Sequence, residues 1–277
     1  MKSSAISLVA VFAVLASSAL AQEPPPLTDD QILSRCRAEM DHMQQAQSMG
    51  QYSFTKRITA GTHDKNGKTT HEDERQYEFV PRSDGRFNLR LLSVKGAPPT
   101  EKELKQHEKE MSKEFAKSNE KVAEDKKKAQ EEELTLSRFY LEEFDFKFAG
   151  RDDWYGTPAF LIEYAPKPKD AQPKDKKERI LGKMAGHMWF SQSRFRILGS
   201  EMHNLESIKS FGGLSGADHI IQRTEYFPTT SGPYMPKVDS VEWELRIGLF
   251  NKFRFSRKEE YSNFQMVETK STVTPPS

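Results

Sequence analysis

The chain has 277 residues, of which 42 are Lys or Arg and 41 are Asp or Glu, and this near balance argues against a strongly basic nucleic-acid-binding protein. The single cysteine, Cys36, excludes an intrachain disulfide framework and a multi-cysteine zinc cluster. Charged residues make up 30% of the chain and the mean hydropathy is −0.77, which excludes a polytopic membrane protein.

The N-terminus has the pattern of a signal peptide. Lys2 precedes an apolar stretch, and Ala19 and Ala21 supply the small residues of a cleavage site. We therefore expect residues 1–21 to be removed by cleavage after Ala21, which would place the mature chain in a bacterial periplasm or outside the cell. An uncleaved anchor is the alternative, disfavoured because the apolar run is short and rich in Ala and Ser.

A first helix is predicted over residues 29–48. Thr28 and Gln31 fit a capping box, and apolar residues then recur at helical spacing. Cys36 belongs to this apolar stripe, so we interpret it as a small buried hydrophobic residue and not as a reactive thiol.

From Tyr52 the hydrophobic period changes to two, which indicates strands. Asn66-Gly67 and Asp84-Gly85 are hairpin signals, so the first third is predicted to be a helix followed by a three-stranded meander.

Residues 101–133 contain nine Lys and eleven Asp or Glu without Gly or Pro, a composition that favours a long, solvated helix. Its apolar stripe is narrow and its heptad breaks after Met111, which makes a coiled coil the less favoured alternative. The denser apolar residues from Leu134 to Leu141 are expected to dock the end of this helix on the body of the protein.

Further strands are predicted in the second half of the chain, interrupted by a basic, Pro-containing loop over residues 165–183. In the clearest of them, Val241, Trp243, Leu245 and Ile247 alternate with charged residues, which predicts one dry and one wet face. Together these patterns predict a mainly β protein with about nine to eleven strands in a sequential meander, folded as a single domain over residues 22–272. The charged helix is expected as an insertion at about residues 100–135, and residues 273–277 as a disordered tail.

The stretch from Phe146 to Glu201 contains a hairpin and a later Trp-containing strand with a set of characteristic positions: Gly150, Gly156, Ala159, Pro166, Gly186, Trp189, Arg196 and Glu201. In these positions it resembles the carrier and sensor superfamily of periplasmic lipoprotein-sorting proteins. The resemblance implies a large curved antiparallel sheet, an incomplete barrel whose concave side is covered by helices and can hold acyl chains. The long charged helix and the basic loop are larger than this family would lead us to expect.

Catalytic and metal-binding motifs do not emerge from the sequence. On a strand, His71 and Asp73 face opposite to Glu72 and Glu74, so the four side chains cannot converge. The glycines around Gly212 lack the lysine and the strand-to-helix context of a phosphate loop, and no G-x-S-x-G elbow occurs. We therefore expect no enzyme activity, no cofactor and no metal.

The leading hypothesis is an exported, non-catalytic binding protein that holds a lipid or lipoprotein acyl chain in an apolar cavity. Six apolar strand residues are candidates for lining it: Phe146, Phe148, Leu161, Trp189, Trp243 and Leu245. The simpler interpretation is that all six pack under the helices as core. Two other functions stay open at this stage, an envelope-stress sensor or interaction module that binds an envelope protein through the charged helix, and an unrecognised envelope hydrolase.

Overall fold

The structure is a computed structural model that describes residues 26–45, 51–64, 67–82, 86–116, 121, 124, 127, 142–168, 176–210, 215–227, 234–247 and 251–267. This part of the chain contains the helices α1 (Asp29–Gln45), α2 (Glu101–Phe115) and α4 (Lys176–Leu181). The strands of the first half are β1 (Tyr52–His63), β2 (Thr69–Pro81), β3 (Phe87–Val94), β4 (Phe144–Trp154) and β5 (Thr157–Pro166). The others are β6 (Met184–Ser191), β7 (Ile197–Asn204), β8 (Ile208–Ser210), β9 (Ser215–Tyr226), β10 (Pro236–Ile247) and β11 (Asn251–Met266).

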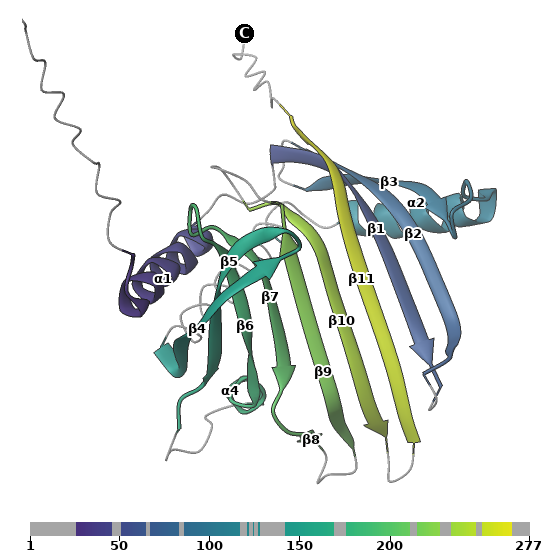
Figure 1. Ribbon diagram of the computed structural model, residues 1–277. Coiled ribbons are helices and arrows are strands. Elements are labelled where there is room, and N and C mark those ends of the chain that lie inside the picture. The colour runs from purple at the N-terminus through teal and green to yellow at the C-terminus, as the bar shows by residue number, and fades with distance from the viewer. Residues whose placement is uncertain are drawn as a thin grey trace, which may run out of the picture.

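All eleven strands belong to one sheet, in the order β3-β2-β1-β11-β10-β9-β7-β6-β5-β4, with β8 paired to β9 beside this path. Neighbouring strands are antiparallel, and the two end strands, β3 and β4, do not pair with each other, so the sheet is curved but not closed (Figure 1). The predicted fold class, a mainly β protein built on a large incomplete barrel with helices on its concave side, is confirmed.

The order of the strands is not a single sequential meander. β1 pairs with β11, which joins two segments about two hundred residues apart, for example Arg57 opposite Glu260. β3 and β4 follow each other in the chain but lie at opposite edges of the sheet. The segment from Val94 to Phe144, which includes α2, therefore connects the two edges.

Helix α1 begins at the predicted capping box. The backbone N–H of Thr28 donates to Gln31 Oε1 at 3.0 Å, and the backbone N–H of Gln31 donates back to Thr28 Oγ1 at 3.3 Å. One stripe of the helix, which includes the fully buried Ile32 and Cys36, packs against the β4 end of the sheet. This packing forms the main hydrophobic core together with Phe146, Ile162 and other side chains of β4 to β7.

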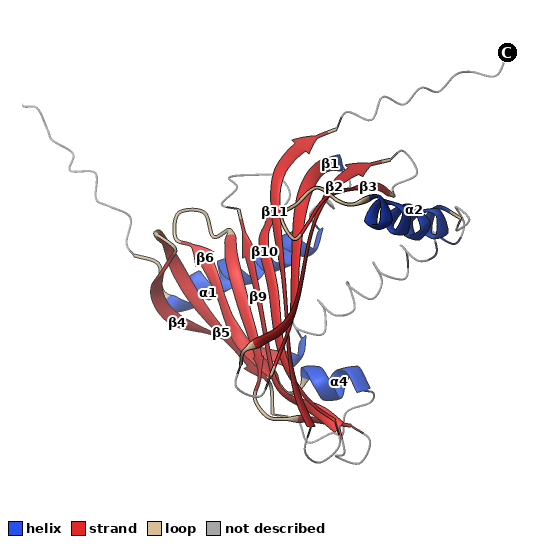
Figure 2. Cartoon of the chain, turned by 90° about the vertical axis from the view of Figure 1, so that its right-hand side faces the viewer, coloured by secondary structure: helices blue, strands red, loops and turns tan. Residues whose placement is uncertain are grey.

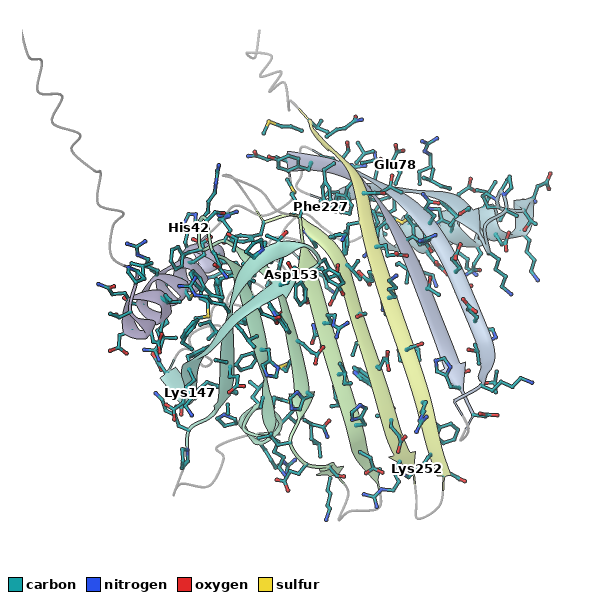
Figure 3. The ribbon with its side chains drawn as sticks, in the orientation of Figure 1. His42, Glu78, Lys147, Asp153, Phe227 and Lys252 are labelled. Carbon is teal, nitrogen blue, oxygen red and sulfur yellow. The ribbon has the colours of Figure 1, made fainter. Side chains whose placement is uncertain are left out.

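Helix α2 lies at the opposite end of the sheet, beside β3 (Figure 2). It starts with a capping box that the sequence analysis did not identify, in which Glu103 accepts hydrogen bonds from the backbone N–H and the hydroxyl of Thr100, both at 2.7 Å. The helix is held by His107, whose Nε2 lies 2.9 Å from the carbonyl oxygen of Leu89, and by Phe115, over which the Arg82 guanidinium lies at 4.7 Å. Continuous helix is described only to Phe115, so most of the predicted helix over 101–133, and its docking end at 134–141, lie outside the described residues.

The predicted loop over residues 165–183 contains a short helix, α4, followed by the start of β6. Residues 169–175 of this loop lie outside the described part of the chain.

The strand registers define two faces of the sheet. The inner face is the one on which both long helices pack, because Phe146 contacts the α1 core and the ring of Tyr77 lies 5.7 Å from that of His107 in α2. Between these helices, β9, β10, β11 and β1 form the middle of the sheet (Figure 1). Their outer face is charged and cross-linked by ion pairs, for example Glu244 with both Lys252 at 2.7 Å and Arg254 at 2.8 Å. The wet face predicted for β10 is therefore this outer face.

Candidate functional site

The six predicted site residues do not lie together. Phe146 and Phe148 belong to the core beneath α1, where Phe146 is buried and Phe148 packs against the buried cluster. Phe148 also contacts the ring of Phe160 at 6.0 Å. These two side chains follow the simpler interpretation, since they fill the space between α1 and the sheet.

Leu161 and Trp189 lie on the outer face, opposite to Phe146 and Phe148. They are register partners of each other, whereas their chain neighbours Ile162 and Phe190 point into the inner core. The Trp189 indole N–H donates to Asp152 Oδ2 at 2.8 Å, and its ring packs against Trp154 at 4.3 Å. The expectation that one cavity is lined by all six residues is thus corrected by the register of β4, β5 and β6.

Trp243 and Leu245 lie on the inner face in the middle of the sheet, between the two helices. Their neighbours on adjacent strands are also apolar: Trp243 is opposite Ile220 of β9 and Phe255 of β11, and Leu245 is opposite Phe253. We call these five side chains the inner apolar patch: Ile220, Trp243, Leu245, Phe253 and Phe255.

The inner apolar patch is open among the described residues. Trp243 is 40% exposed and Phe253 is 52% exposed, although both lie on the helix-bearing face of the sheet. The face of β10 predicted to be dry is therefore partly exposed to solvent, and its Trp243 and Leu245 do not belong to the core that α1 forms with the sheet. Exposed apolar residues that are contiguous on one face are typical of a binding surface.

An ionic group borders the patch on the same face. Glu259 accepts hydrogen bonds from Lys56 Nζ at 3.1 Å and from the Tyr261 hydroxyl at 2.7 Å, and it pairs with Arg257 Nη2 at 2.5 Å. Burial alone would raise the pKa of Glu259, but the hydrogen bond from Tyr261 and the charge of Lys56 outweigh it and lower the pKa below its usual value. The carboxylate is therefore ionised at neutral pH.

A cavity of about 310 Å³ lies between this ionic group and α2. Its lining is Ile58, Ala60, Asp73, Arg75, Tyr77, Phe255 and Arg257. Phe255 belongs to both the cavity and the inner apolar patch, so the two are continuous along the sheet. A second cavity of about 270 Å³ lies under α2, and Arg75 lines both.

A further hollow of about 580 Å³ lies toward the hairpin ends of the central strands. Several of its polar groups already have partners within the chain, since Glu244 pairs with Lys252 and Arg254, and His63 Nε2 lies 2.8 Å from Ser256 Oγ. Its lining includes Trp243 and Phe255, but most of its other residues, such as Glu244 and Ser256, belong to the outer face, so the hollow lies on the opposite side of the sheet from the inner apolar patch. We therefore take the patch and the smaller cavity beside it, where charge and apolar surface meet, as the candidate site.

The structure adds residues to the site that the sequence analysis did not select. Ile220 and Phe253 belong to the patch because of their register with β10. Arg75 and Arg257 lie near each other because β2 and β11 pair with the two sides of β1. The alternation within each strand can be predicted from the sequence, but the pairing of the strands in the sheet cannot.

Chemistry of other kinds finds little support in the described ranges. They contain no group of three or more His, Cys, Asp or Glu side chains that could hold a metal ion. Within the same ranges, no helix combines the length and the apolar character that crossing a membrane requires. The Cys36 thiol is buried in the α1 core, and burial raises its pKa to about 12, with the nearby Glu39 carboxylate adding to the effect.

Comparison with known proteins finds relatives only among solved structures, since no protein-family model and no curated protein matches the chain. A DUF1329 family protein from Desulfovibrio piger matches with 13% identity and a TM-score of 0.31, covering 88% of this chain and 95% of its own. A LolA superfamily protein from Nitrosomonas europaea matches with 11% identity and a TM-score of 0.28, covering 91% and 99%. A putative outer membrane lipoprotein-sorting protein domain from Vibrio parahaemolyticus matches with 10% identity and a TM-score of 0.33, covering 86% and 92%.

Structures described as a LolA superfamily protein and as a lipoprotein-sorting protein domain are thus among those that match. Because the identities and TM-scores are low, the function proposed below is argued from the residues of this chain.

Proposed function

We propose that this protein is a non-catalytic binding protein of the cell envelope that holds an acyl chain against the inner apolar patch. One observation carries the proposal: Trp243 and Phe253 are partly exposed on the helix-bearing face of the sheet, where apolar residues normally form core. Export would follow from the signal peptide predicted over residues 1–21, which lies outside the described residues.

The physical driving force for such binding is sufficient. Each methylene group moved from water into an apolar environment contributes about 0.8 kcal/mol. A chain that covers Trp243, Ile220 and Leu245 also removes their own apolar surface from water. No reactive group is needed for this, which agrees with the expectation of a non-catalytic protein.

Tryptophan fluorescence can test the proposal directly. In a Trp154→Phe/Trp189→Phe variant, Trp243 is the remaining indole of the chain and reports on the patch alone. Titration with dodecanoate is expected to change its emission saturably.

The chain offers a matched control pair in β9. Ile220 is opposite Trp243 and lies on the inner face, whereas its neighbour Ile221 is opposite Glu242 and lies on the outer face. Ile220→Glu should abolish the fluorescence response, and Ile221→Glu should leave it unchanged. An unchanged response in Ile220→Glu, or no response in the folded parent, would count against an acyl-binding patch.

A second candidate function is an interaction module for an envelope protein. It is favoured by α2, which carries exposed charged residues such as Lys102 and Lys109 together with Leu104, 39% exposed. If this function is the correct one, reversing the charge of Lys102 and Lys109 should abolish capture of the partner from envelope extracts, while the acyl titration of Trp243 stays flat.

A further inference from the structure

The cavity beside the inner apolar patch has a specific construction. Ala60 of β1 lies between Asp73 of β2 and Arg257 of β11 in the strand register. Its small side chain stands between two long charged ones, which leaves the hollow of about 310 Å³. The next inner position of β1, Ile58, lies between Arg75 and Glu259 and gives the hollow an apolar wall.

The lining of this cavity is positively charged. It contains two guanidinium groups, those of Arg75 and Arg257, against one carboxylate, that of Asp73. Arg75 Nε lies 3.0 Å from Asp73 Oδ2, so Asp73 is already paired.

The positive charge of Arg257 is only partly neutralised by its ion pair. Its partner Glu259 is shared with Lys56 and with the Tyr261 hydroxyl. The next carboxylate on this face, Asp239, does not line the cavity and accepts a hydrogen bond from Thr224 Oγ1 at 3.2 Å. Arg75 also forms a side-chain hydrogen bond with Tyr77 and lies near the Glu110 carboxylate of α2. A guanidinium group has five N–H donors, so both arginines keep donors for another anionic acceptor.

From this juxtaposition we infer that the ligand is a single-chain anionic amphiphile. Its carboxylate or phosphate head lies in the cavity between Arg75 and Arg257, and its chain runs over Phe255 onto the inner apolar patch. The inference rests on the proposed acyl-binding function and adds the chemical class of the head group to it.

Four amphiphiles with the same chain separate the contributions of head and tail: dodecanoate, dodecyl phosphate, dodecanol and dodecyltrimethylammonium. Each is titrated at low ionic strength into the variant whose only indole is Trp243, and inorganic phosphate is added as a competitor without a chain. The two anions are expected to bind at least about fivefold more tightly than dodecanol, which corresponds to about 1 kcal/mol for partly exposed charge-assisted contacts. This preference should shrink in high salt.

Substitutions locate the preference within the structure. Arg257→Gln, at a side chain that is 46% exposed and so tolerant of change, should bring the anions close to dodecanol while dodecanol binding stays the same. Arg254→Gln is the matched control, because Arg254 lies three residues earlier in β11 and pairs with Glu244 on the outer face. Ala60→Leu, which fills the cavity, should likewise remove the preference.

The outcomes distinguish acyl binding from recognition of the anionic head group. If none of the four amphiphiles alters the fluorescence of the folded protein, the acyl-binding function itself fails. If all four bind equally, or if Arg257→Gln and Arg254→Gln behave alike, acyl binding stands and the anionic head group is refuted. Full displacement by inorganic phosphate would identify a site for the free anion and would also refute an amphiphilic ligand. Tighter binding of one anion than the other assigns the head as carboxylate or phosphate.

Discussion

Gly199 is the position at which the structure makes its sharpest stability prediction. A Cβ atom at Gly199 in β7 would lie 2.3 Å from Cζ2 of Trp154 and 2.8 Å from the carbonyl oxygen of Thr224 in β9. Real Cβ atoms do not approach other heavy atoms so closely. The second contact involves backbone, so strand β9 as well as the indole ring must move to admit the methyl group.

The expected cost of Gly199→Ala is about 1–3 kcal/mol of unfolding free energy, the usual range for overpacking a tightly packed site. For a domain of this size that is a fall in melting temperature of roughly 2–4 °C per kcal/mol. Gly61→Ala is the matched control in β1 of the same sheet. Its nearest neighbours, Ser256 Oγ at 3.2 Å and His63 Nε2 at 3.4 Å, are side-chain atoms that need to shift by only a few tenths of an ångström. We expect its stability to stay within about 0.5 kcal/mol of the wild type.

Urea unfolding followed by circular dichroism measures both variants, and a Trp154→Ala background isolates the part of the cost that comes from the indole. If Gly199→Ala were as stable as the wild type, or Gly61→Ala as destabilised as Gly199→Ala, the assigned packing of Trp154 over β7 would be refuted.

Three further predictions concern the helices. Burial raises the pKa of the Glu39 carboxyl despite its ion pair with Arg196 at 3.2 Å. The folded state therefore holds this proton more tightly than the unfolded state, and stability should fall as pH rises through the folded-state pKa. Urea titrations between pH 4 and 8 should show a flatter stability profile for Glu39→Gln than for the wild type, and an equal slope would contradict the assignment. Cys36, with its pKa of about 12, should react with a thiol reagent at neutral pH only at the rate of unfolding, whereas rapid labelling of native protein would show that the α1 core is open. Replacing residues 105–128 by a flexible linker should lower the melting temperature by only a few degrees, because the described part of α2 contacts the sheet mainly through His107 and Phe115. Loss of cooperative unfolding in this variant would contradict the prediction.

Local features of the fold could be predicted from the sequence because they depend on neighbouring residues. The capping box at Thr28 and Gln31 and the alternation around Trp243 are of this kind, and both are present in the structure. Gly67 has a φ of 81°, as the turn predicted at this position requires.

The candidate site could be predicted only in part because it depends on long-range register. Trp189 and Phe146 belong to opposite faces, and a shift of one residue in the pairing of their strands would reverse that relation. A register irregularity between Phe148 and Gly150 reverses the faces of β4 beyond this point, so that Gly150 pairs with Leu161 and the alternation along the sequence no longer gives the face. Likewise, the pairing of β1 with β11 that places Ala60 beside Arg257 closes across almost the whole chain.

The central claim, that the inner apolar patch holds an acyl chain, is tested most directly by native mass spectrometry of the protein mixed with dodecanoate. A single bound chain per protein is predicted for the wild type and for Ile221→Glu, and none for Ile220→Glu. Equal adducts in all three proteins, or none in the wild type, would contradict it.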